Sequence, residues 1–185
     1  MLNQVIAQSV RRVLSIVALC AIAAAIGGCA VAPSKPESIV PSTVGSAKQH
    51  PQTVSVLVAG GVDTNPSTRL RLTNATVSEG LVASINKHHV FSRVISGAGA
   101  DYVLTVTMMS GDFPSFAATF TVKAELAWSL KRADGTTVWQ QVIRTEGTAT
   151  GGEAFAGVER VKMATERSVR ENVAQGLAKL ADLNL

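Results

Sequence analysis

Cysteine is almost absent from this chain of 185 residues, which contains only Cys20 and Cys29. Because no cysteine follows residue 29, the rest of the chain cannot contain an internal disulfide, a thiol nucleophile or a zinc site built on thiolates. A domain of this size does not need such a cross-link, since it buries about two-thirds of its unfolded surface on folding. The sequence therefore predicts a domain that folds without a disulfide, a metal or a cofactor.

An excess of charge is also absent once residues 1–28 are set aside. The whole chain has 17 basic and 13 acidic residues, and Arg11 and Arg12 are the only charged residues among the first 28. The remaining 15 basic and 13 acidic residues give a formal charge of +2. This near-neutral balance gives no electrostatic case for nucleic acid as a partner.

An apolar run from Val13 to Ile26 follows this basic pair. The run is shorter than the roughly 20 residues that cross a bilayer core, and no cluster of charges comes after it. Residues 1–28 are therefore predicted to be a secretory signal peptide. Two alternatives stay open: an uncleaved transmembrane anchor, and an ordinary signal peptide with an incidental cysteine.

The end of this segment, Ile26-Gly27-Gly28-Cys29, carries the most specific motif in the chain. The small residues Gly27 and Gly28 let a signal peptidase bind the extended backbone. The four residues resemble the lipobox of bacterial lipoproteins. That resemblance implies that Cys29 is acylated and anchors the protein in a membrane, and that Ala30 favours the outer membrane, with the domain facing the periplasm.

Residues 29–52 contain four of the six prolines in the chain, among Ser, Lys, Thr and Gly. Because proline interrupts both helices and sheets, we expect an extended tether between the acylated cysteine and a single folded domain at 53–185. The tether would let the domain leave the membrane surface and approach partners. The alternative is an ordinary spacer with no binding role.

Residues 53–185 divide into strands and helices by the spacing of their apolar residues. Strands are predicted at 53–59, 90–96, 101–110, 119–130 and 137–148, and helices at 65–88 and 156–183. Asn65 is expected to cap the first helix with Pro66 at its first position. Asp134-Gly135 predicts a tight hairpin between the last two strands, and Trp128 and Trp139 are expected to be core residues of that hairpin.

This order predicts an α+β fold. A mostly antiparallel sheet of about four or five strands would pack under two helices in a two-layer sandwich.

Three short segments and the closing helix carry a further resemblance. The segments are His89 to Val94, Ala100 to Leu104, and Asp134 to Trp139. They resemble small periplasmic lipoproteins that share a fold with the N-terminal domain of TolB, the lipopolysaccharide-assembly lipoprotein LptE and the auxiliary lipoproteins of lipid-trafficking ABC transporters. The resemblance implies a non-enzymatic accessory role in the cell envelope.

No catalytic residue and no metal ligand set is predicted. His88 and His89 are adjacent, so on a helix their side chains point about 100° apart and do not readily chelate one ion. A serine in a nucleophile elbow and a recognisable pair of catalytic carboxylates are both missing. The glycine-rich segments 97–101 and 147–152 lack the residues of a phosphate-binding loop.

Phe113 and Phe116 lie together in the loop expected at 111–118. Beneath the sheet they would belong to the core, whereas exposed they would form an apolar patch of the kind that contacts a partner. We expect a membrane-anchored accessory protein that docks an envelope protein. The alternative is a carrier that holds a lipid or glycolipid between helices and sheet, and an enzyme is the least favoured reading.

Overall fold

The computed structural model describes residues 32–45, 48–65, 67, 70–112 and 118–185. Residues Pro33–Leu185 form one compact unit. After a short 3-10 helix, its elements follow in the predicted order of strand, helix, four strands and helix. Within the described residues, no helix is both long and apolar enough to cross a membrane.

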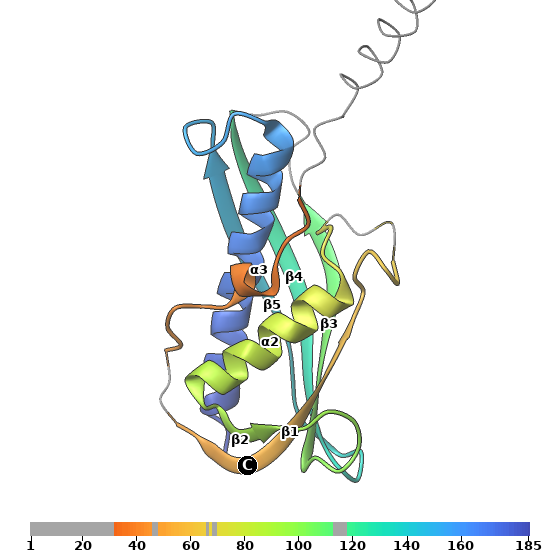
Figure 1. The fold of residues 1–185 in the computed structure, drawn as a ribbon. Helices are drawn as coiled ribbons and strands as arrows, with labels where there is room; N and C mark the ends of the chain where they lie inside the picture. Colours follow the sequence, from red (N-terminus) through yellow and green to blue (C-terminus); the bar gives the residue numbers. More distant parts are fainter. Residues whose placement is uncertain (1–31, 46–47, 66, 68–69, 113–117) are drawn as a thin grey trace, which may run out of the picture. The chain divides into compact units, whose positions relative to one another are not determined.

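Five strands form one sheet in the order β2-β1-β3-β4-β5. They are β1 (His50–Ala59), β2 (Phe91–Val94), β3 (Tyr102–Asp112), β4 (Thr119–Arg132) and β5 (Thr137–Thr150). β1 runs parallel to both of its neighbours, whereas β3, β4 and β5 form an antiparallel meander. The predicted sandwich with a mostly antiparallel sheet is therefore partly wrong, because the sheet is mixed and curled (Figure 1).

The parallel strands follow from the helix between them. A chain that leaves one strand, crosses the sheet as a helix and returns beside that strand runs in the same direction again. α2 (Asn74–His88) makes this crossing between β1 and β2. β3 then takes the other side of β1.

α2 and α3 (Gly157–Ala181) cover the same face of the sheet (Figure 1). The covered face is made of alternate strand residues, as the sequence predicts for β3 and β4. The fully buried large side chains of this face are Leu104, Met108, Leu126, Trp128 and Leu130. The helices add fully buried side chains of their own, Leu81 and Ile85 from α2 and Leu177 and Leu180 from α3. Both helices therefore contribute to one apolar core.

α2 begins nine residues after the predicted start at Asn65. Thr73 is the N-cap residue, and its hydroxyl oxygen accepts a hydrogen bond from the backbone N–H of Thr76 at 3.1 Å. An N-cap threonine satisfies one of the free amides of the first turn in this way. Leu70, which the sequence placed in the helix, is buried in the loop before it, and Pro66 lies outside the described residues.

α3 touches the sheet directly at two glycines. A Cβ at Gly176 would lie 2.4 Å from Cζ2 of Trp128, and one at Gly147 would lie 2.2 Å from the backbone oxygen of Ala164. Trp128 is fully buried and donates from Nε1 to Oδ1 of Asn172 at 2.9 Å. The core position predicted for Trp128 is confirmed, and only residues without a side chain fit this closely.

Residues of the expected tether pack on the domain. The 3-10 helix η1 (Pro36–Ile39) places Ile39 in the core against Gly80 of α2. Lys87 donates to the backbone oxygen of Pro41 at 2.9 Å. The structure thus differs from the tether expected at 29–52, because proline fits the first turn of a helix and Ile39 supplies apolar surface to bury.

Candidate functional site

The residues that the sequence analysis connects with function lie outside the described part of the chain. They are Ile26, Gly27, Gly28 and Cys29, which precede the compact unit, and Phe113 and Phe116, which lie between β3 and β4. Their roles in cleavage, acylation and partner contact stay predictions.

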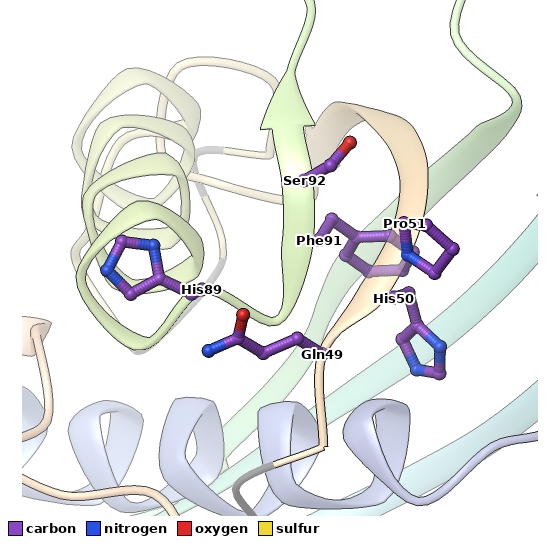
Figure 2. Close-up of a pocket in the computed structure, with 6 residues that line it drawn as sticks. All are labelled: Gln49, His50, Pro51, His89, Phe91 and Ser92. Atoms are coloured by element: carbon purple, nitrogen blue, oxygen red, sulfur yellow. The ribbon is translucent and has the colours of Figure 1, made fainter.

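A pocket of about 340 Å³ lies where β1 and β2 begin, beside the end of α2 (Figure 2). Its lining residues are Gln49, His50, Pro51, His89, Phe91 and Ser92. His50 is buried, with Nε2 2.9 Å from the backbone oxygen of Leu180, and its ring lies 5.3 Å from that of Phe91. Ser92 donates to the backbone oxygen of Gln52 at 2.9 Å. His50 and Ser92 therefore connect β1 with α3 and β2.

His88 and His89 lie at the end of α2, as predicted. Nε2 of His88 is 3.1 Å from the backbone oxygen of Pro41, and His89 is the C-cap residue, with a φ of 53°. In the described part of the chain, no group of three or more His, Cys, Asp and Glu side chains could hold a metal ion.

Asp101 joins β1 to the start of β3. Its carboxylate accepts hydrogen bonds from the backbone N–H of Thr53 at 2.8 Å and from the hydroxyl of Thr53 at 2.7 Å. Both bonds lower the pKa of Asp101, and the bond from the backbone N–H of Thr53 has the larger effect. Because both donors favour the charged form of the carboxylate, Asp101 is suited to a structural role.

The face of the sheet away from the helices exposes both apolar and charged residues. Leu57, Met109 and Val142 are exposed there. Cross-strand ion pairs join Lys123 to Glu146 at 3.3 Å and Arg144 to Glu125 at 2.8 Å. Exposed pairs of this kind contribute little to stability, about 0–1 kcal/mol each.

The β5–α3 loop, residues 151–156, is held in place by one ion pair and several hydrogen bonds. Glu153 pairs with Arg167 of α3 at 2.5 Å and accepts from the backbone N–H of Thr150 at 2.9 Å. The hydrogen bond from Arg167, followed by that from Thr150, lowers the pKa of Glu153 to about 2. Arg167 also donates to the backbone oxygen of Thr148. The first half of the loop is thereby fixed to both β5 and α3.

Arg160 holds the second half of the same loop. Its Nη1 donates to the backbone oxygen of Ala154 at 2.9 Å and to that of Phe155 at 2.7 Å. Its guanidinium carbon lies 5.3 Å from the centre of the Phe120 ring, within reach of a cation–π interaction. The loop is therefore fixed in a conformation that leaves the side chain of Phe155 100% exposed.

Comparisons with known proteins show the fold. No protein-family model and no curated protein matches the sequence. Protein XCC0632 from Xanthomonas campestris, described with the family model DUF330, is similar at 15% identity and a TM-score of 0.56, over 77% of this chain and 89% of that chain. The hypothetical protein CT253 from Chlamydia trachomatis is similar at 10% identity and a TM-score of 0.52, over 70% of this chain and 98% of that chain.

A minor lipoprotein from Acinetobacter baumannii is also similar, at 9% identity and a TM-score of 0.49, over 72% of this chain and 92% of that chain. The likeness to XCC0632 and CT253 shows a shared fold alone. The finer resemblance to TolB, LptE and the ABC-transporter lipoproteins stays a prediction.

Sequence reasoning missed Phe155 and the two arginines that hold its loop. Phe155 follows the Gly151-Gly152 break and precedes the helix, so its place in a connection was visible. Glu153 and Arg167 are 14 residues apart, and their pairing depends on the angle between β5 and α3. From the sequence alone, only Phe155 could have been singled out, as an aromatic residue in a connection between two elements.

Proposed function

We propose that this chain is a bacterial lipoprotein, acylated at Cys29 and anchored in the outer membrane, with its domain facing the periplasm. The observation that carries the proposal is the position of the lipobox-like motif. Cys29 follows the apolar run after Gly27 and Gly28, and it stands four residues before Pro33, where the compact unit begins. Cleavage before Cys29 would therefore leave the whole compact unit attached to the acyl chains.

The proposed role is that of a non-enzymatic accessory protein that docks another protein of the cell envelope. The polar groups that the fold brings together support this role, because they bind each other within the structure. Asp101 accepts from Thr53, and Asn172 from Trp128. Phe113 and Phe116 are the proposed partner contact.

The alternative function, a lipid or glycolipid carrier or an auxiliary subunit of an ABC-type lipid transport system, is less favoured. It needs room for acyl chains between the helices and the sheet. At Gly147 and Gly176 the helix α3 and the sheet are already in contact, with no space for even a methyl group. A carried lipid would have to lie elsewhere or displace α3.

The experiment is purification of the full-length protein from gently solubilised membranes, followed by mass spectrometry of its N-terminal peptide and of everything that co-purifies. We expect a triacylated Cys29, an envelope protein in stoichiometric amount, and loss of both in Cys29→Ser. An unmodified Cys29 would refute the anchor. Bound lipid without a protein partner would favour the carrier.

The variant Phe116→Ser tests the docking site within this experiment. Partner capture should be lost while the domain stays folded, as judged by circular dichroism. Unchanged capture would remove the loop between β3 and β4 from the proposal and leave the acylation intact.

A further inference from the structure

The end of the domain that carries Phe155 is the end from which the chain leads to Cys29. From η1 onward, the chain runs toward the C-terminal end of α3. Gly45 lies beside Ala178, and Nζ of Lys48 donates to the backbone oxygen of Leu183 at 2.6 Å. In the opposite direction, the first residues of the unit, drawn in dark orange, run toward the end where β3 and β5 finish and α3 begins (Figure 1). We call this the loop end of the domain.

The length of chain outside the compact unit keeps this end close to the acyl chains. Only residues 30–32 separate the acylated cysteine from Pro33, the first residue of the unit. Four residue steps span at most about 14 Å even when fully extended. Since η1 is packed on α2, residues 36–41 do not add to this reach.

The loop end displays two apolar side chains that are largely exposed. Phe155 is 100% exposed and Val158, in the first turn of α3, is 58% exposed. Arg160 binds the carbonyl groups of Ala154 and Phe155, so the aromatic ring is held out from a fixed loop. Because the backbone of this loop is already ordered, no entropy of loop ordering is lost when Phe155 binds.

Four of the charges beside Phe155 occur in two pairs, which makes their approach to a bilayer less costly. Glu153 pairs with Arg167 at 2.5 Å, and Glu159 pairs with Lys162 at 3.5 Å. A paired charge costs less to remove from water than an isolated one. The loop end therefore combines exposed apolar groups with two charge pairs, and Arg160 adds a cation that donates to two backbone carbonyl groups.

We propose that the β5–α3 loop and the first turn of α3 form a second membrane contact, in which Phe155 and Val158 enter the interfacial region of the bilayer that holds the acyl chains of Cys29. This inference rests on the proposed acylation. It fixes the orientation of the domain, with the β4–β5 hairpin at Asp134-Gly135 pointing away from the membrane. β5 has 14 residues, so the two ends lie about 45 Å apart.

The test uses the acylated full-length protein in vesicles of phosphatidylethanolamine and phosphatidylglycerol. Because Cys29 is acylated and Cys20 is removed with the signal peptide, one introduced cysteine gives a unique spin-label site. Gly152→Cys places the label in the β5–α3 loop, where a Cβ meets no atom closer than 3.9 Å. Thr136→Cys places a control label in the hairpin.

We expect the label at 152 to be shielded from a water-soluble nickel complex and accessible to lipid-soluble oxygen, while the label at 136 stays accessible to the nickel complex. Adding Phe155→Ser should restore nickel access at 152. Vesicle-bound, acylated protein with equal nickel access at both labels would overturn the second contact and leave the anchor intact. Protein without acyl chains that does not float with vesicles would overturn both.

Discussion

Replacing Gly80 by alanine is expected to release η1 from α2 while the rest of the domain stays folded. A Cβ at this position would lie 2.5 Å from Cγ1 of Ile39 and 2.9 Å from the backbone oxygen of Pro36. The side chain of Ile39 can rotate away, but the backbone oxygen of Pro36 moves only if η1 moves. The substitution therefore acts on the docking of this segment.

The effect of Gly80→Ala on free energy combines two opposing contributions. Overpacking of this kind costs about 2 kcal/mol, whereas alanine in place of a glycine inside a helix stabilises that helix by about 1 kcal/mol. The first effect weakens the docking of η1, and the second strengthens α2. A docking loss of about 2 kcal/mol corresponds to roughly 30-fold faster hydrogen exchange in the released segment.

The assay is amide hydrogen exchange at Ser38 and Val40, whose N–H groups donate to the backbone oxygens of Lys35 at 3.0 Å and Glu37 at 3.2 Å. Glu79→Ala, at an exposed neighbouring position of α2, is the control and should leave both amides protected. If Gly80→Ala leaves the exchange of these amides unchanged, η1 is not held by its contact with Gly80 and the reasoning is refuted.

Two further predictions concern buried and charged groups. Asn172→Ala should lower the free energy of unfolding by about 3 kcal/mol in urea titrations, because it leaves buried partners without hydrogen bonds; fully additive losses in the double variant with Trp128→Phe would contradict this coupling. Since the pKa of Glu153 falls from 4.5 to about 2 on folding, its stabilising effect is present above pH 4.5 and is lost as the pH falls to about 2. The difference in unfolding free energy between the wild type and Glu153→Gln should shrink over that range, and a difference independent of pH would argue against the pairing with Arg167.

The antiparallel half of the fold could be predicted because its signals are local. The alternation along residues 119–130 and the turn at Asp134-Gly135 determine β4, β5 and the hairpin between them. The helical spacing from residue 156 likewise predicts α3, which runs from Gly157 to Ala181. Each of these patterns lies within one element or in two neighbouring ones.

The parallel half could be predicted only in part. The strands β1 and β2 were recognisable, but their direction depends on how α2 crosses the sheet. The start of α2 was misplaced because Asn65-Pro66 is as good a start signal as Thr73, and the burial of Leu70 against Gly111 decides between them. η1 docks on α2 because Gly80 has no side chain there. The proline content of residues 29–52 gives no sign of this contact.

The candidate site also combines a feature that local sequence signals predict with one that only the fold reveals. The motif that ends at Cys29 is local and was found in the sequence, whereas the loop that carries Phe155 is fixed by Arg160 and Arg167, which the fold brings to it. An exposed phenylalanine in a connection is ambiguous until those contacts are known.

The contacts between the start of β1 and the end of α3, with the residues beside them, have a consequence for how the chain would fold during the proposed export. His50 reaches the backbone oxygen of Leu180 across 130 residues, and Lys48 reaches that of Leu183 across 135. Contacts this distant in sequence form late, because the intervening chain must first be brought together. A chain that emerges with its N-terminus first cannot complete its core until the last turn of α3 has followed. Under the proposed export, the domain would therefore stay incompletely folded throughout translocation.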